Sequence, residues 1–355
     1  MPESIEQISI SDVRRLLLIK PSSLGDIVHA LPIIPVLRAR FPQAEVSWLV
    51  KEQWADILER VEGIDRIWKV KDRLDGWIDT MRRLRSHRFD LVIDLQGLLR
   101  SGVLAWRTGC SIRVGFENAR EGSPWFYTHC VSVPNPDIHA VDRYLTVARY
   151  LGCSIPDRVR FPFVFTQEHE ATVRDTLSKH GVGPQSRWAA LNVSARWPTK
   201  RWPRESFVEV ANRLLTEGWD GIIVIGGAED RVETESVIQA VKGRAVNLAG
   251  QIPLRVLPAL LRAAGCLITN DSGPMHVAAA VGTPVVALFG PTSEIRTGPY
   301  GLGHDVCSVT LPCRPCFSRI CRQKVHLECL TRITPAEVVR QVHRVTSGSA
   351  VSLIS

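Results

Sequence analysis

Short runs of leucine and β-branched residues alternate with longer amphipathic stretches in both halves of this chain, and that alternation constrains its fold most strongly. A strand followed by a helix that packs back beside it is the repeating unit of parallel-sheet proteins. Parallel strands are buried on both faces, so they form nearly continuous apolar runs. The pattern predicts an α/β protein. The predicted strands are Leu16–Lys20, Val46–Val50, Leu91–Leu95, Trp188–Val193, Gly221–Ile225, Cys266–Thr269 and Pro284–Phe289.

The amphipathic stretches predict the helices that connect these strands. They are Ile27–Phe41, Trp54–Val61, Val141–Leu151, Arg204–Glu217, Arg255–Ala264 and Met275–Val281. We expect residues 155–185 to form a linker and the start of the second half. A chain of 355 residues is longer than one hydrophobic core usually serves, so the halves predict two domains. Ligands of open α/β sheets bind outside the carboxyl ends of the strands, which predicts a cleft between the halves.

The composition excludes several other classes of protein. With 45% apolar and 23% charged residues, the chain is globular rather than disordered or collagen-like. Its longest apolar stretch, Val277–Gly290, is interrupted by Gly282 and Pro284 and is shorter than the roughly 20 residues that span a bilayer. The acidic N-terminus is not a secretory signal, so we expect a cytoplasmic protein with reduced cysteines. The excess of 44 Lys and Arg over 36 Asp and Glu predicts an anionic partner.

A turn that contains serine and glycine follows the first strand and opens a helix at Lys20–Ile27. Backbone N–H groups at a helix N-terminus attract anions, and Gly25 permits close approach. Asp26 stands where either a helix cap or a catalytic carboxylate is expected, and taken alone the cap is the commoner role. Because Gly25 has no companion glycines, the turn is not a dinucleotide-binding fingerprint.

Further turns in the second half contain groups that suit a phosphorylated ligand. The segment Thr269–His276 follows a strand and opens a helix, so its hydroxyl residues and glycine predict a diphosphate cradle, which His276 can face. The loop Ser194–Pro203 carries three cations and two tryptophans, a pattern that favours stabilisation of a leaving group over a solvated loop. Glu229 follows a glycine pair and is either a ribose ligand or an ordinary acid at a helix N-terminus.

Four motifs occur in order along the chain: SSLGDIVHALP, KRWP, IGGAED and NDSGPMHVAAAVGTPVVALFGPT. Together they resemble the ADP-heptose:lipopolysaccharide heptosyltransferases of glycosyltransferase family 9, over about residues 14–345. The first motif is most similar to the heptosyltransferase I type. The resemblance implies the GT-B fold, two Rossmann-like domains facing each other across a cleft. Residues 1–165 would bind the acceptor, residues 166–334 (with a Cys-rich segment at 307–330) the nucleotide sugar, and residues 335–355 would form a helix and tail.

The resemblance also implies roles for individual residues. It makes Asp26 the general base, overriding the capping interpretation, and makes Lys200 the catalytic cation that binds phosphate. The implied donor-binding residues are Ser194, Lys200, Glu229, Asp271, Ser272, Gly273 and His276. The implied acceptor-binding residues are Ser22, Ser23, Gly25, Asp94, Gln96, Gly97, Arg100, Arg120 and His139.

The implied reaction is an inverting displacement on ADP-heptose, the donor substrate. Asp26 removes a proton from an acceptor hydroxyl as the bond from heptose C1 to ADP breaks, and Lys200 stabilises the departing diphosphate. The chain has no Asp-x-Asp triplet, which agrees with a transferase that requires no cofactor. The implied acceptor is the Kdo-lipid A inner core of lipopolysaccharide. We therefore expect peripheral association with the cytoplasmic face of the inner membrane, and no nucleic-acid partner.

Two segments concentrate the positive charge. Residues 66–88 contain eight Lys and Arg against three Asp, and residues 307–347 contain seven against two Glu, so each has a net charge of +5. The first segment either holds an anionic glycolipid and leaflet or is a solvated helix face. The second contains Cys313, Cys316, Cys321 and Cys329. Four thiols can bind zinc or iron, but only the first pair has the usual spacing, so reduced structural thiols are the favoured interpretation.

Two alternatives to first-heptose transfer are open. One is a family 9 transferase that adds a later heptose or another sugar, because the Cys-rich segment is similar to other subgroups. The other is a non-catalytic protein that binds a nucleotide sugar or nucleic acid, which the basic composition would suit. A binding protein would tolerate the loss of Asp26, whereas a transferase would lose turnover.

Overall fold

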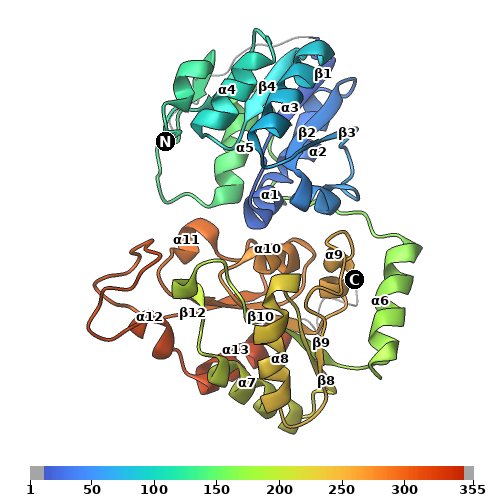
Figure 1. Cartoon of the computed structure of the whole chain (residues 1–355), viewed down its shortest axis with the longest axis vertical. Coiled ribbons are helices and arrows are strands. Elements are labelled where there is room, and N and C mark those ends of the chain that lie inside the picture. Colours follow the sequence, from blue (N-terminus) through green and yellow to red (C-terminus); the bar gives the residue numbers. More distant parts are fainter. Residues whose placement is uncertain (1–11, 348–355) are drawn as a thin grey trace. The chain divides into compact units, whose positions relative to one another are not determined.

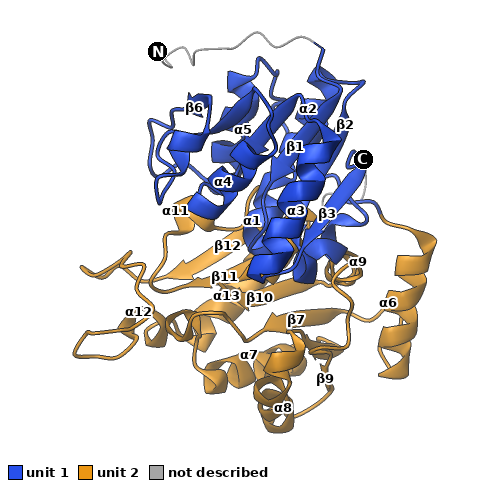
Figure 2. Ribbon diagram, turned by 45° about the horizontal axis from the view of Figure 1, so that its top comes forward, with its two compact units in different colours: residues 1–164 blue, residues 165–355 orange. Residues whose placement is uncertain are grey.

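The computed structural model of the protein describes residues 12–347. The chain divides into two compact units, Met1–Val164 and Phe165–Ser355, coloured separately in Figure 2. This division falls one residue from the boundary expected from the sequence. The terminal helix α13 (Pro335–Ser347) packs on α7, β11 and β12 of the second unit, so it is not a separate part. The expected tail after it, residues 348–355, lies outside the described residues.

Within residues 12–164, six parallel strands form one sheet in the order β3-β2-β1-β4-β5-β6. The strands are β1 (Arg15–Ile19), β2 (Glu45–Lys51), β3 (Arg66–Val70), β4 (Leu91–Asp94), β5 (Arg113–Phe116) and β6 (His129–Val131). Strand β4 and all but the first residue of β1 are buried, as expected for central strands covered on both faces. The predicted strands of this half are therefore confirmed.

The connections of this unit pack as two groups of helices. The helices are α1 (Leu24–Ala30), α2 (Ile33–Arg40), α3 (Leu74–His87), α4 (Leu99–Arg107) and α5 (Ala140–Tyr150), with 3₁₀ helices η1 (Glu52–Leu58) and η2 (Ser123–Phe126). Helix α5 packs on α1 and α2, whereas α3 packs on α4. Right-handed crossovers in a sheet of this strand order place the two groups on opposite faces (Figure 1).

Two helix predictions in this unit are wrong in detail. The single helix expected over 27–41 is two helices, because Pro32 has no N–H to continue the first one and stands as the N-cap of α2. The helix also starts earlier than expected, with Ser23 as its N-cap. The segment expected as a helix over 54–61 is the shorter 3₁₀ helix η1.

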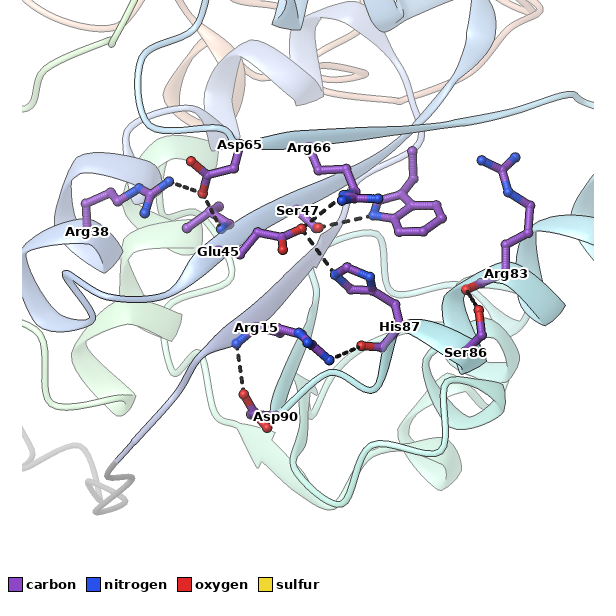
Figure 3. A network of polar contacts seen from close by, with 12 residues as sticks. Arg15, Arg38, Glu45, Ser47, Asp65, Arg66, Arg83, Ser86, His87 and Asp90 are labelled. Atoms are coloured by element: carbon purple, nitrogen blue, oxygen red, sulfur yellow. Dashed lines mark hydrogen bonds and ion pairs between the residues drawn. The ribbon is translucent and has the colours of Figure 1, made fainter.

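A polar network fixes the amino ends of β1 and β2 and the last turn of α3 (Figure 3). The Asp90 carboxylate accepts hydrogen bonds from the backbone N–H of Arg15 at 2.8 Å, and the Arg15 guanidinium donates to the His87 carbonyl at 2.8 Å. Glu45 contacts Arg66 at 3.0 Å and the His87 ring at 3.1 Å. These bonds join α3 to the sheet at the end away from the carboxyl edge.

Within residues 165–347, a second parallel sheet of six strands has the order β12-β11-β10-β7-β8-β9. The strands are β7 (Trp188–Asn192), β8 (Gly221–Val224), β9 (Ala245–Asn247), β10 (Cys266–Asn270), β11 (Val285–Phe289) and β12 (His304–Ser308). The helices before α13 are α6 (Gln167–Lys179), α7 (Arg204–Thr216), α8 (Arg231–Ala240), α9 (Leu257–Arg262), α10 (Gly273–Ala280), α11 (Glu294–Thr297) and α12 (Glu328–Thr331), with 3₁₀ helices η3 (Pro198–Lys200) and η4 (Ala228–Asp230).

The segment expected as a linker over 155–185 contains a regular helix, α6. Thr166 caps it by accepting a hydrogen bond from the His169 backbone N–H, and Val173 and Leu177, four residues apart, are buried. The apolar stripe is only one residue wide, so the sequence pattern is dominated by polar residues. The helix expected over 255–264 is also shorter than predicted, with Pro258 in its first turn.

Both sheets reverse their strand order at equivalent places. In the first unit the chain crosses from β3 back to β4 beside β1, and in the second it crosses from β9 back to β10 beside β7. Ligands of doubly wound sheets bind at such switch points, outside the carboxyl ends of the two central strands. The fold therefore indicates that ligands bind at the loops after β1 and β4 in one unit and after β7 and β10 in the other. None of the helices in residues 12–347 combines the length and apolar character needed to cross a bilayer.

Candidate active site

Asp26 lies directly after β1, in the first turn of α1. Its Oδ2 atom accepts hydrogen bonds from the Ser23 backbone N–H at 3.0 Å and from the Ser23 hydroxyl at 2.9 Å. Asp26 thus does cap the turn that contains it, and these bonds fix the orientation of a half-buried carboxylate. An oriented carboxylate at a switch point can also accept a proton from a bound hydroxyl.

A buried lysine stands behind this carboxylate. Lys20 begins the turn that leaves β1; its Nζ donates to the Leu95 carbonyl at 3.2 Å and lies 5.2 Å from the centre of the Tyr144 ring. Burial alone would lower the pKa of Lys20, but Tyr144, Asp26 and Asp94 outweigh burial and raise it. Lys20 is therefore a permanent cation beside two carboxylates. No role was predicted for Lys20 from the sequence, although a lysine at the end of an apolar strand indicates a buried charge that needs a partner.

Asp94 ends β4, the neighbour of β1, and is fully buried. Its Oδ1 atom accepts from the backbone N–H groups of Gln96 at 2.8 Å and Gly97 at 3.2 Å, and its Oδ2 atom accepts from the Tyr127 hydroxyl at 2.7 Å. Burial raises the pKa of Asp94, against the opposing effect of these hydrogen bonds and of one with Ser101. Gly97 has φ +66°, a backbone conformation that favours glycine. Asp94 thus shapes the loop after β4 from inside.

Replacing Asp94 by asparagine is expected to preserve the fold, because an amide oxygen can accept from the two N–H groups and Tyr127 can rotate its hydroxyl to accept. Alanine leaves three buried donors without partners and is expected to destabilise by about 2–4 kcal/mol. Since the pKa of Asp94 is raised on folding, its contribution to stability falls as pH rises above its unfolded pKa. The free energy of unfolding of D94N, measured in urea between pH 4.5 and 7.5, should therefore rise relative to that of the natural protein as pH rises. A rise of this difference as pH falls would contradict the prediction.

The remaining acceptor-side residues predicted from the sequence are less closely grouped. Arg100 pairs with Asp72, in the loop before α3, at 3.2 Å and lies 5.1 Å from the ring centre of Trp77 on α3. Arg120 is exposed, and its backbone N–H donates to the Gly97 carbonyl at 2.9 Å. His139 caps α5 by accepting from the backbone of the first helical turn at 3.2 Å. The structure thus groups Ser22, Ser23, Gly25, Asp94, Gln96 and Gly97 at the β1/β4 switch point, and directs the Arg100 side chain elsewhere.

In the second unit, buried asparagines join the loops after β7 and β10. The Asn192 amide donates to the Ser272 hydroxyl at 2.5 Å and to the Thr269 hydroxyl at 2.9 Å. Asn270 donates to the Val193 carbonyl at 2.6 Å. Ser272 is the N-cap of α10, so these bonds set the direction in which the N-terminus of α10 points. Neither asparagine was assigned a role from the sequence, although each ends a buried strand at the switch point.

The cation and carboxylate predicted at the donor site form a pair. Lys200 Nζ lies 2.5 Å from Asp271 Oδ2, which also accepts from the Thr292 hydroxyl at 2.6 Å. Asp271 is 5% exposed, and the lysine head group lies 4.8 Å from the Trp197 ring centre. The structure therefore confines a cation beside the first turn of α10, where backbone N–H groups also favour an anion. His276 is buried on the same helix.

Other donor-side residues differ in how they are held. The Ser194 hydroxyl is buried and has no hydrogen-bond partner among residues 12–347. Glu229 is exposed, has no hydrogen bond or ion pair within the described part of the chain, and folds back over Gly227, where a Cβ would come within 2.5 Å of its carboxylate. The acid that does contact the cationic loop is Glu233, paired with Arg201 at 3.0 Å. In the sequence, Glu233 is close enough to Glu229 that a shift of register would move the implied ribose-binding acid onto it.

The Cys-rich segment packs beneath the lysine loop. Cys329 is buried, Cys313 and Cys321 are half-buried, Cys316 is exposed, and all four are free thiols. Burial raises the pKa of Cys329; Arg314 opposes this, and the other three thiols add to it. Across residues 12–347, no three His, Cys, Asp or Glu side chains are arranged to hold a metal ion.

The same segment contacts donor-side residues through its middle. The Ser318 carbonyl accepts from the Thr199 hydroxyl at 2.8 Å, and the Arg319 guanidinium lies 5.1 Å from the Trp197 ring centre. The Phe317 backbone N–H donates to the Pro291 carbonyl at 2.8 Å. Residues 317–319 therefore support the loop that carries Lys200.

Comparison with known proteins agrees with this arrangement. The sequence model of Glycosyltransferase family 9 (heptosyltransferase) matches residues 77–326. Lipopolysaccharide heptosyltransferase 1 of Pseudomonas aeruginosa is 28% identical, with 92% of this chain and 97% of that protein aligned.

Two solved structures are similar over nearly the whole chain. The glycosyl transferase family 9 structure from Veillonella parvula has a TM-score of 0.84 at 24% identity, covering 97% of this chain and all of that one. The structure of ADP-heptose lps heptosyltransferase II of E. coli has a TM-score of 0.79 at 23% identity, covering 95% of this chain and 100% of that one. These likenesses confirm the predicted GT-B architecture of two Rossmann-like units.

Proposed function

The chain belongs to glycosyltransferase family 9, and from that membership we propose that it transfers a heptose from ADP-heptose to the Kdo-lipid A inner core of lipopolysaccharide. The observation that supports this most directly is the chemistry at the two switch points. A carboxylate backed by a buried cation stands at one, and a cation held at a helix N-terminus stands at the other.

On the acceptor side, Asp26 is the proposed general base. Ser23 orients its carboxylate, and the buried Lys20 favours its ionised form, which is the form that removes a proton. Ser22, Gly25, Gln96, Gly97, Arg120 and His139 are the proposed contacts to the acceptor sugar. Because Arg100 is held by Asp72 and Trp77, its proposed part is to fix the start of α4 rather than to bind sugar.

On the donor side, the diphosphate is proposed to lie at the N-terminus of α10, between Ser272, Gly273 and Lys200. Charge that develops on the leaving diphosphate is stabilised by the lysine and by the N–H groups of the first turn. The buried Ser194 hydroxyl is available to this ligand, and the exposed Glu229 to its ribose. All of these are protein groups, so the proposed reaction requires no cofactor.

The proposed position of transfer is the first heptose. The Pseudomonas relative named heptosyltransferase 1 and the opening motif SSLGDIVHALP support it. The E. coli structure named heptosyltransferase II keeps a later heptose as the second candidate. Either acceptor is a glycolipid, so the proposed location is the cytoplasmic face of the inner membrane, as a peripheral protein.

Transfer is tested by incubating purified protein with ADP-heptose and two defined acceptors, one ending in Kdo and one ending in a first heptose. The expected result is a mass gain of one heptose on the Kdo-terminated acceptor only. Gain on the heptose-terminated acceptor alone would assign the later addition. If neither acceptor gained mass while the protein still bound ADP, heptose transfer to the lipopolysaccharide core would be rejected.

A further inference from the structure

Apolar side chains are exposed on the outer surfaces of α3, α4 and η2. Trp125 is 89% exposed and Leu74 is 80% exposed, and Trp106, Leu99 and Ile78 are each between four and five tenths exposed. Single exposed apolar residues are ordinary, but two tryptophans and three aliphatic residues on adjoining elements are not. We call these five residues the apolar face.

The elements that carry the apolar face are packed against one another. Leu74 and Ile78 are one turn apart on α3, and Leu99 and Trp106 are two turns apart on α4. Helices α3 and α4 are in contact, as the two views also show (Figures 1 and 2). Gly102 lets η2 approach α4, since a Cβ there would meet the Ser123 carbonyl oxygen at 3.0 Å.

One end of the apolar face adjoins the edge of the sheet where the acceptor-side residues lie. Leu74 begins the helix that follows β3, Leu99 begins the helix that follows β4, and Trp125 lies in the connection after β5. In a parallel sheet all of these connections leave from the carboxyl edge, which also carries Asp26. Leu74 and Leu99 therefore lie at the edge that carries the proposed sugar site. Trp106 is in the last turn of α4, and Trp125 is next to Phe126, whose carbonyl accepts from Arg113 at the start of β5, so these two lie toward the opposite edge.

Cations flank the apolar face, but fewer are available than the sequence count suggests. Of the eight Lys and Arg in residues 66–88, four are engaged by carboxylates: Arg66, Lys69, Arg73 and Arg83. Figure 3 shows two of them beside the indole of β3. Lys71, Arg82, Arg85 and Arg88 in this segment and Arg107 on α4 have no carboxylate partner among residues 12–347. Arg82 and Arg85 continue the outer stripe of Leu74 and Ile78 along α3.

We infer that the apolar face docks on the surface of an anionic lipid bilayer, an inference that rests on the proposed glycolipid acceptor. Tryptophan beside arginine is suited to the headgroup region, where the ring enters the interface and the cation meets anionic lipid. A second copy of the chain would bring the same unpaired cations against one another, so charge disfavours self-association through this face. Docking here would hold the β1/β4 edge beside the membrane that contains the acceptor.

The inference is tested by sedimentation of the full chain with vesicles of phosphatidylcholine, with and without phosphatidylglycerol. Binding is expected only with the anionic lipid and should fall as salt rises. The variant L74S/W106S/W125S is expected to bind about tenfold or more weakly. The variant R82E/R85E should weaken binding as well. Val232, 85% exposed on α8 of the other unit, supplies the matched control V232S, which should bind like the natural protein.

Three further readouts decide the outcome. L74S/W106S/W125S and R82E/R85E should keep the thermal midpoint of the natural protein and its turnover on a deacylated, water-soluble acceptor, while losing turnover on vesicle-embedded acceptor; V232S should keep all three. Unchanged vesicle binding by L74S/W106S/W125S, or loss of binding only in F317S/I320S of the Cys-rich segment, would overturn the inference. A dimer of the natural protein that this triple variant converts to monomer would also overturn it. Failure of the proposed function appears separately, as no transfer by the natural protein to either acceptor form.

Discussion

Substituting Asp26 by asparagine is expected to lower kcat by roughly 10²–10⁴-fold, the usual contribution of a positioned general base. Asparagine has the same shape, and its amide oxygen can still accept from the Ser23 N–H and hydroxyl, so the turn before α1 should persist. The group lost is the one that takes the acceptor proton. Affinity for ADP should not change, because the proposed diphosphate site is built from residues of the second unit. Steady-state kinetics and ADP titration calorimetry measure both quantities.

The matched control for D26N is S23A, which removes one of the two bonds to the carboxylate and keeps the carboxylate itself. Losing a capping hydroxyl is expected to cost about 1 kcal/mol of stability and to reduce kcat far less than D26N does. If D26N turned over as fast as the natural protein, Asp26 would be a helix cap only. Its role would then be to accept the Ser23 hydrogen bonds at the start of α1, as the structure shows.

Substituting Lys200 by methionine is expected to have a double effect, on stability and on turnover. The change leaves Asp271 as a buried charge that has lost its cation and keeps the Thr292 hydroxyl as a hydrogen-bond donor, and removing one partner of a buried pair typically costs about 3–5 kcal/mol. It also removes the cation proposed to stabilise the leaving diphosphate. Urea unfolding and kcat, measured on the same preparation, give the two effects.

The double variant K200M/D271N separates stability from catalysis. Asparagine is uncharged and can still accept from Thr292, so most of the lost stability should return, while turnover should stay low. Recovery of turnover together with stability would contradict the proposed role of Lys200 and leave it as a structural partner of Asp271. The single variant D271N completes the cycle and gives the coupling energy between the two side chains.

The central strands could be predicted from sequence because each is a buried run that ends at a turn of distinctive composition. Strands β3, β5, β6, β9 and β12 could not, because they lie at or next to sheet edges, are short or only partly buried, and so lack a continuous apolar run. Helix ends were less predictable than helices. A proline inside an apolar pattern divided α1 from α2, and the polar surface of α6 concealed its narrow buried stripe.

The residues of the candidate site also fall into those that could be predicted from the sequence and those that could not. Asp26, Lys200 and Asp271 could be predicted because they stand in short motifs, and the resemblance to a family gave those motifs a chemistry. Lys20, Asn192 and Glu233 could not, because their importance depends on which other loops they meet. Local sequence fixes the residue that leaves a strand, but contacts between loops after β7, β8 and β10 depend on a strand order that only the folded sheet reveals.

The bond from Thr199 to the Ser318 carbonyl and the stacking of Arg319 on Trp197 also affect how this protein can vary. Through these contacts the loop that carries Lys200 rests on a segment with almost no secondary structure of its own. Insertions, deletions or alkylation of thiols in that segment will therefore shift the position of Lys200. A change in the length of the Cys-rich segment will therefore also change how Lys200 is placed for the donor, and the two have to be altered together.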